Sequence, residues 1–261
     1  MPAIVIAMDD DWYLQAGSGA RFDWGPTGAE RLSSAVACLV VIDVLSFTTS
    51  VTVAVESGTR VFPHAWRDAS AAAFADRVDA RLAVGRRMAT PASPWSLSPS
   101  ALKDAPFTPR LVLPSPNGSS IAAAAGGSTV VAGCLRNATA VGRWLARNGY
   151  GTPARPVAVI ASGERWPDGS LRLALEDLLG AGAVLSALRK HRGGPLSPEA
   201  ATAAACFETT PDVVATVTAG ASGQELVTGG FPEGVRIATQ LDASDTVTVP
   251  VLTNGAFTAA G

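Results

Sequence analysis

The sequence predicts an α/β protein in which a mostly parallel sheet is covered by helices on both faces. Short, valine-rich apolar runs recur along the chain, and the one at 36–42 is near-continuous. Runs of this kind are typical of strands that are buried on both faces. Stretches with helical spacing of apolar residues alternate with the runs, as a parallel sheet requires. The chain of 261 residues is long enough to bury a sizeable core, and we expect one domain over residues 1–261.

Each apolar run marks an expected strand, and most stretches between the runs are expected helices. Strands are expected at 36–42, 60–63, 82–84, 111–113, 129–132, 157–160 and 246–252. Helices are expected at 47–57, 68–80, 118–125, 137–148 and 176–190, with further helical pieces after 198. Residues 20–30 combine aromatic side chains with glycines and a proline, so we expect a loop there. Residues 255–261 are expected to fray.

Composition and charge exclude several classes of partner. The net charge is −2, so there is no basic excess to bind a nucleic acid. No apolar run reaches membrane-spanning length, and the first residues lack the cationic start of a secretory signal. We therefore expect a cytoplasmic protein that binds neither nucleic acid nor membrane, and a homo-oligomer is compatible with these numbers. The excess of arginine and alanine is typical of a GC-rich bacterial genome.

The three cysteines carry little information about function. Cys38, Cys134 and Cys206 are few, odd in number and far apart. This pattern argues against a disulfide framework and against a cysteine-based metal site. We expect them to be buried small hydrophobic residues.

A carboxylate and a cluster of hydroxyl groups follow the first strand. Asp43 ends the apolar run, and Ser46, Thr48, Thr49 and Ser50 come directly after it, before a helical stretch. In open α/β sheets the ligand binds beyond the carboxyl ends of the strands, where a helix N-terminus offers free N–H groups to an anion. The pattern predicts a ligand site that includes Asp43, Thr48 and Thr49. The alternative is that these side chains only cap a helix.

A small polar turn follows the strand at 111–113. It contains Ser115, Asn117, Gly118 and Ser119 and leads into an alanine-rich helix. Glycine lets the backbone approach a ligand closely, and helix N–H groups then point at it. The turn predicts phosphate binding, although it lacks the Walker lysine and the dinucleotide glycine pattern. The alternative is a capped helix start.

More carboxylates lie further along the chain. Glu164 follows the strand at 157–160, as Asp43 follows the first strand. Glu176 and Asp177 begin a long helix. Because adjacent helical positions point about 100° apart, at most one of these two is expected to face the same ligand as Glu164.

Residues 86–109 form a proline-rich segment that is long for a loop inside a compact domain. Prolines at 91, 94, 99, 106 and 109 interrupt it. A loop of this length is typically functional or mobile, and we expect it to cover the site as a lid. Arg86 opens the segment directly after the strand at 82–84, where it would either contact an anion or be a surface charge.

Several segments, taken in order, resemble the 2-phosphosulfolactate phosphatase (ComB-type) family. They are VVIDVLSFTTS, LPSPNGSS, GCLRNA, SGERWPDGSLRLALEDLLGAGAVL and SGQELVTGGFPEGVRIATQLDASDTVTVPVL, and the resemblance spans 35–252. It implies an α/β fold of the ComB type and a Mg²⁺-dependent phosphoric monoester hydrolase. The implied substrate is 2-phosphosulfolactate, a small-molecule phosphate ester.

The resemblance also implies roles for the candidate residues. Asp43 matches the strand-end aspartate of the family, 115–119 its SPNG segment, and Glu164, Glu176 and Asp177 its GE and ED pairs. Carboxylates suit Mg²⁺, which prefers hard oxygen ligands and keeps waters that a phosphate can replace. On this basis Asp43 and Glu164 are catalytic, and all four carboxylates are candidate metal ligands. Water, or Asp43 itself, would attack phosphorus in line.

Two positions depart from the family pattern. Ser46 stands in DVLSFTT where the family commonly has an arginine in DVLRATT, and Leu173 stands where a proline is common. A change from arginine to serine removes a fixed charge and a bidentate donor. This motivates an alternative, a non-catalytic binding protein for a small phosphorylated or sulfonated anion. A hydrolase with Cys134 or Ser162 as nucleophile is disfavoured, because neither of the two histidines adjoins a clear nucleophile motif.

Overall fold

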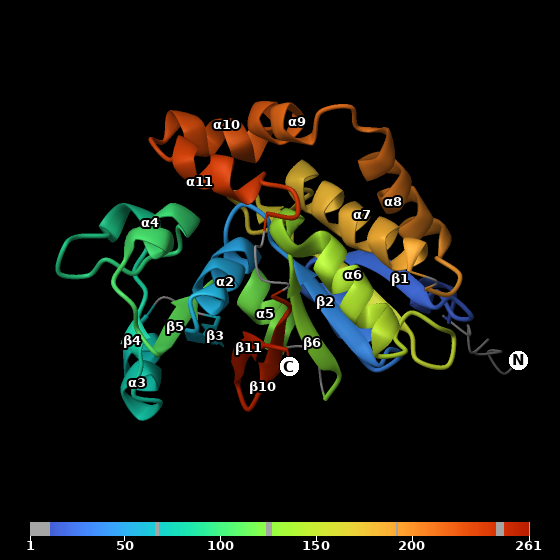
Figure 1. Ribbon diagram of the computed structural model, residues 1–261, viewed down its shortest axis with the longest axis horizontal. Coiled ribbons are helices and arrows are strands. Elements are labelled where there is room, and N and C mark those ends of the chain that lie inside the picture. The colour runs from blue at the N-terminus through green and yellow to red at the C-terminus, as the bar shows by residue number, and fades with distance from the viewer. Residues whose placement is uncertain (1–10, 66–67, 124–126, 192, 244–247, 261) are drawn as a thin grey trace, which may run out of the picture.

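The computed structural model describes residues 11–65, 68–123, 127–191, 193–243 and 248–260. Among these residues nine strands form one sheet (Figure 1). In spatial order the strands are β1 (Ala20–Trp24), β7 (Val157–Ala161), β2 (Cys38–Ile42), β6 (Thr129–Gly133), β10 (Pro250–Thr253), β11 (Ala256–Ala259), β3 (Arg60–His64), β5 (Arg110–Pro114) and β4 (Arg81–Leu82). The predicted α/β class with a mostly parallel sheet is confirmed.

The sheet consists of two parallel blocks joined by an antiparallel hairpin. β1, β7, β2 and β6 pair in parallel, as do β3, β5 and β4. The β10–β11 hairpin pairs antiparallel with β6 on one side and with β3 on the other. Because three successive pairings are antiparallel, the two blocks run in opposite directions.

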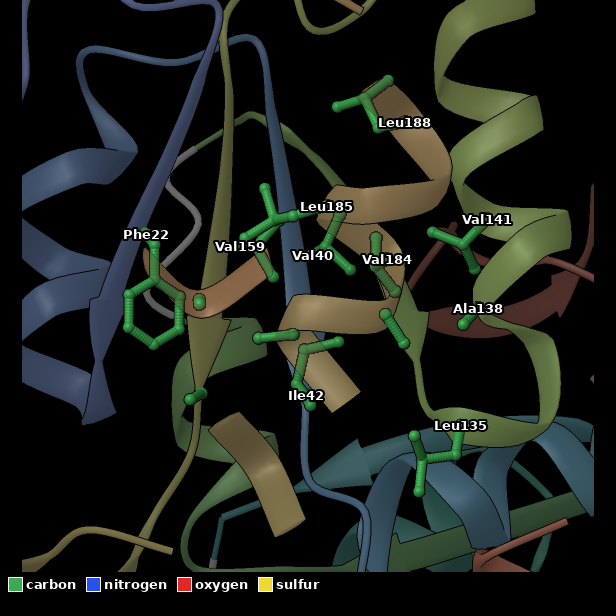
Figure 2. Close-up of a cluster of buried hydrophobic side chains, with 14 of the residues drawn as sticks. Phe22, Val40, Ile42, Leu135, Ala138, Val141, Val159, Val184, Leu185 and Leu188 are labelled. Carbon is green, nitrogen blue, oxygen red and sulfur yellow. The ribbon is translucent and has the colours of Figure 1, made fainter. Parts of the chain in front are cut away.

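Helices cover both faces of the larger block. α6 (Ala138–Arg147), α7 (Leu175–Lys190) and α8 (Pro198–Thr209) pack on one face, and α1 (Gly25–Ser33), α2 (Phe47–Glu56) and α5 (Gly118–Ala123) on the other. Successive strand residues point to opposite faces, so the fully buried β2 contributes to two cores. Val40 and Ile42 pack with Val184 of α7 (Figure 2), whereas Leu39 and Val41 face the other core.

A second group of helices lies over one end of the sheet. α9 (Val213–Ala219), α10 (Ala221–Thr228) and α11 (Pro232–Ala238) lie side by side, at the top of the view in Figure 1. α4 (Pro99–Asp104) contacts α11 and α2, and α3 (Ala69–Arg77) packs against β5. The remaining elements are the short hairpin β8 (Glu164–Arg165) with β9 (Leu171–Arg172), and the 3-10 turns η1 (Asp11–Leu14), η2 (Arg86–Met88) and η3 (Leu135–Asn137).

The structure corrects expectations about one segment near the start of the chain and two near its end. The expected loop at 20–30 is instead strand β1 followed by the first turns of α1. Gly25, with a φ of +64°, lets the chain pass directly from strand to helix, and Pro26 is favourable in the first helical turn. The expected frayed end contains β11, where Phe257 is completely buried. The strand expected at 246–252 starts at Pro250, and 244–247 lie outside the described residues.

The segment expected to be a lid is partly helical. It contains η2 and α4, and Arg86 at its start donates from Nε to the Leu97 carbonyl oxygen at 3.2 Å. A covering role for residues 86–109 stays a prediction, as does the single domain. Cys38 and Cys134 are buried free thiols, as expected, while Cys206 is partly exposed. Within the described ranges, no helix has the length and apolar character needed to cross a membrane.

Candidate active site

A polar cavity of about 310 Å³ lies where the turns after β2 and β5 meet β8 and α10. The residues predicted from the sequence that line it are Asp43, Arg86, Ser115, Asn117 and Glu164. The other lining residues are Leu45, Ser46, Leu97, Pro116, Ser222, Glu225 and Leu226. The structure therefore brings together candidates that are far apart in the chain, from four separate segments.

Asp43 both caps a helix and lines the cavity. One carboxylate oxygen, Oδ1, accepts hydrogen bonds from the backbone N–H groups of Ser46 (3.1 Å) and Phe47 (3.0 Å) at the start of α2. The other oxygen, Oδ2, lies against Gly118. If residue 118 had a side chain, its Cβ would lie 3.0 Å from Asp43 Oδ2 and 2.3 Å from the Phe47 ring. Only glycine allows this close approach, so the SPNG turn is pressed against the Asp43 carboxylate.

The geometry does not support phosphate binding by Thr48 and Thr49. Both side chains are completely buried and neither lines the cavity. The Thr48 hydroxyl accepts from the Asp43 N–H (2.9 Å) and donates to the Asp43 carbonyl (2.8 Å), while Thr49 donates to the Val44 carbonyl at 2.8 Å. Threonine hydroxyls bond readily to nearby backbone, and here they stabilise the turn that carries Asp43.

Asn117 links the SPNG turn to Glu164. Its Nδ2 donates to the Gly163 carbonyl at 3.2 Å and lies 3.4 Å from Glu164 Oε2. Ser115 is nearly buried but lines the cavity. Ser119 is also buried, does not line the cavity, and its hydroxyl has no hydrogen-bond partner among the described residues. Of the residues in the turn that predicts phosphate binding, Ser115 and Asn117 line the cavity, whereas Gly118 lies against Asp43.

Asp177 connects the two turns that carry Asp43 and Glu164. Its Oδ1 accepts from the Val44 N–H at 2.7 Å, and its Oδ2 accepts from the Gly163 N–H at 2.9 Å. Each of these amides is adjacent in the chain to one of the two cavity carboxylates. Asp177 is 3% exposed and does not line the cavity. It is therefore placed to set the separation of Asp43 and Glu164 rather than to contact a ligand.

Glu176 is also set back from the cavity. It is 2% exposed, and its side chain is hydrogen-bonded to Ser222, which does line the cavity. Arg172 is close enough to favour its charged form. Glu176 therefore links the start of α7 to α10 and stabilises the position of Ser222 in the cavity wall.

Burial raises the pKa values of all four carboxyl groups, and repulsion from neighbouring carboxylates adds to it for Glu164, Glu176 and Asp177. Burial is the largest cause in each case. For Glu164, repulsion from Asp43 and Glu176 adds to burial, and its pKa rises to about 7. The pKa of Asp177 is raised well above its usual value, again with repulsion from Asp43 and Glu176 after burial. Carboxyl groups with raised pKa values that repel one another favour a cation near them.

Arg86 supplies a positive charge at the cavity, beside the turn that carries Asp43. Its Nη2 donates to the Leu45 carbonyl oxygen at 3.2 Å, next to Ser46. Its guanidinium lies 5.5 Å from the centre of the Phe231 ring, and its charge favours the ionised form of Asp43. Arg86 is therefore held at the cavity, where the sequence predicted either an anion contact or a surface charge.

The cavity carboxylates have the chemistry that Mg²⁺ prefers. Among the described residues, no three acidic, histidine or cysteine side chains are gathered into a ready-made metal site. Mg²⁺ does not require one, because proteins usually bind it through one or two carboxylates together with waters and substrate phosphate oxygens. Asp43 and Glu164 are the two predicted ligands that line the cavity, so the residues present fit this ion.

The raised pKa values predict how stability depends on pH when no metal is bound. Between the ordinary pKa of 4.5 and about 7, Glu164 keeps a proton in the folded state that the unfolded state has released. Rising pH through this window therefore favours the unfolded state. We expect the melting temperature in EDTA to fall between about pH 5 and about pH 8, and Glu164→Gln to reduce that fall. A melting temperature that rises over this range would contradict the assignment.

Sequence reasoning missed the contribution of α10. Ser222 lies inside α10, is buried and lines the cavity with Glu225 and Leu226. Ser222 and Glu225 are three positions apart and so share a helix face. That spacing was the only available signal, and it does not show which element the face packs against.

The fold is of the α/β class, and the cavity brings together five of the predicted site residues. The chain belongs to the 2-phosphosulpholactate phosphatase family, whose model matches residues 27–255. The family resemblance seen in the sequence is thereby confirmed, and the protein is a phosphoric monoester hydrolase by family. No curated protein matches the chain.

Proposed function

We propose that this protein is a Mg²⁺-dependent phosphatase that hydrolyses a small anionic phosphate monoester, 2-phosphosulfolactate or a related phospho-acid. The observation that supports this most is the cavity itself, which Asp43, Glu164 and Arg86 line together. The two carboxylates suit a metal ion, and the guanidinium suits phosphoryl oxygens. The family match supports the same reaction class.

In the proposed mechanism, Asp43 and Glu164 hold Mg²⁺ and the chain's other groups orient the ester. Bound Mg²⁺ would neutralise the charge that develops on the phosphoryl oxygens. Arg86 and the Asn117 side chain hold the phosphoryl group with its ester bond in line with a water molecule. The water oxygen bonds to phosphorus as the bond from phosphorus to the ester oxygen breaks. The proton that the water gives up passes to Glu164 and from there to the ester oxygen, which leaves as the alcohol.

Glu164 is the group best suited to accept a proton from the attacking water. Without a metal its pKa is raised to about 7 by burial and by repulsion from Asp43 and Glu176; bound Mg²⁺ would favour the charged carboxylate, which is the form that accepts a proton. Asp43 is less suited to attack phosphorus itself, because its Oδ1 already accepts two backbone hydrogen bonds. We therefore favour water as the nucleophile.

Phosphate release from a panel of esters tests the proposal. The panel contains 2-phosphosulfolactate, phospholactate and isopropyl phosphate, each assayed with Mg²⁺ and with EDTA. We expect EDTA-sensitive release that is fastest for an ester with an additional acid group. Release that is insensitive to EDTA would refute the metal requirement, and absence of release would refute the phosphatase.

The second candidate function is a non-catalytic binding protein for a small phosphorylated or sulfonated anion. The observation that favours it is Ser46, which lines the cavity without a charge. In the phosphatase proposal Arg86, hydrogen-bonded to the neighbouring Leu45, supplies a cation at this wall instead. Ligand binding without turnover on any ester would select the binding protein. We place either function in the cytoplasm, in keeping with the free cysteines.

A further inference from the structure

A second cavity, of about 230 Å³, lies beside the first and shares two residues with it. Asn117 and Glu164 line both cavities, so they form the wall between them. The second cavity is otherwise lined by the start of α1, by Ser162 and Arg165, and by the side chain of Leu171 among others. The proposed mechanism uses none of these other residues.

The start of α1 offers backbone donors to this cavity. Gly25 and Thr27, in the first turn, line it, and first-turn N–H groups have no partner within a helix. No side chain hydrogen-bonds to this end of the nine-residue helix as a cap, and the first turn contains no acidic residue. Asp23 accepts from the Trp24 N–H at 2.7 Å and lies beside Gly28 of α1, but it does not line the cavity. Such a helix start favours an anion.

Ser162 is an independent sign of a ligand. It is 1% exposed and lines the second cavity, yet its hydroxyl forms no hydrogen bond with any described residue. A buried hydroxyl without a partner is costly and rare in native proteins. A ligand with acceptor oxygens in the cavity would satisfy it.

Arg165 adds a fixed positive charge. Its Nε donates to Asn117 Oδ1 at 3.2 Å, and its Nη1 donates to the Gly169 carbonyl at 3.0 Å. These bonds hold the guanidinium at the cavity that Arg165 lines, and they leave Nη2 without a hydrogen bond to the described part of the chain. Arginine in this arrangement suits a carboxylate or a sulfonate.

We propose that the second cavity binds the acid group of the substrate, a carboxylate or a sulfonate, while the phosphate ester occupies the first. This inference rests on the proposed function for the identity of the ester. Because Asn117 and Glu164 line both cavities, the two cavities are adjacent. Ser162, Arg165 and the start of α1 then determine that the enzyme selects esters with a second acidic group.

Calorimetric binding of the dephosphorylated product, 3-sulfolactate, tests this without any turnover. We expect Arg165→Ala to weaken binding by about tenfold or more and Ser162→Ala by about fivefold. Arg147→Ala is the matched control, because it removes the same charge from an exposed position in the last turn of α6; its affinity should stay within about twofold of the wild type. Ser162→Ala removes an unpartnered hydroxyl, so its melting temperature should not fall.

The outcomes separate this inference from the proposed function. Absence of 3-sulfolactate binding by the wild type, or wild-type affinity in both variants, would overturn the subsite even if esters are hydrolysed. Loss of binding in both variants would support the subsite even if no phosphate is released. Lactate, which lacks the sulfonate, identifies the group: an equal loss for both ligands assigns the carboxylate, and a loss confined to 3-sulfolactate assigns the sulfonate.

Discussion

Asp43→Asn is expected to lower the rate of phosphate release by at least about a hundredfold while the protein stays folded. The substitution removes a negative charge from the cavity wall, where the proposed Mg²⁺ would be held. It keeps a carbonyl oxygen that accepts hydrogen bonds from the N–H groups of Ser46 and Phe47, so the start of α2 stays capped. Steady-state phosphate release with saturating Mg²⁺, together with circular dichroism, provides the measurement.

A matched control comes from another helix-capping carboxylate. Asp68 accepts from the Ser70 N–H at the start of α3, and it does not line the cavity. Asp68→Asn therefore changes the same chemical group, which again accepts a backbone N–H at the start of a helix. We expect its turnover to match the wild type. Turnover in Asp43→Asn within about threefold of this control would rule out a central role for Asp43.

Asp177→Ala is expected to lower both stability and turnover, although Asp177 does not line the cavity. The substitution leaves the buried N–H groups of Val44 and Gly163 without their acceptors. Each loss costs about 1–3 kcal/mol, so the free energy of unfolding should fall by roughly 2–6 kcal/mol. Because the two turns also carry Asp43 and Glu164, their separation is no longer held. Urea unfolding and steady-state kinetics measure the two effects.

A positioning role for Asp177 predicts a specific kinetic pattern. We expect kcat to fall by at least about tenfold per folded molecule with a smaller change in KM, because misplaced catalytic groups affect the transition state most. Asp177→Asn keeps one acceptor oxygen and should recover part of the loss. Asn137→Ala is the control, since it removes the buried acceptor of the Cys134 N–H at the end of β6. It should lose stability but keep kcat, and equal kcat losses in both would assign Asp177 a structural role only.

The local pattern of apolar residues in the sequence predicts much of the fold. The valine-rich strands and the α/β alternation follow from burial and periodicity, and the elements at 60–64, 110–114, 129–133 and 157–161 lie where they were expected. The exceptions have physical causes. β1 was missed because a single glycine with positive φ, Gly25, joins strand to helix where a loop was expected. β11 was missed because its pairing partners, β10 and β3, are set by long-range contacts.

The residues of the candidate site also fall into those that the sequence predicted and those whose place only the structure showed. Asp43, Glu164, Ser115, Asn117 and Arg86 each follow a strand, and that position alone marked them as candidates before any tertiary contact was known. All five line the cavity. The sequence by itself therefore determined the class of protein, the family resemblance and the side chains that carry the proposed chemistry.

Only the tertiary structure decided which groups line the cavity. Thr48 and Thr49 have suitable chemistry, but their hydroxyls bond to the backbone of the turn instead. Asp177 was a candidate metal ligand, yet packing of α7 places it between two strand-end turns. The contribution of α10 and the second cavity likewise depend on how distant segments pack. The physical reason is that residue type and spacing set what a side chain is able to do, whereas long-range packing sets which partner it meets.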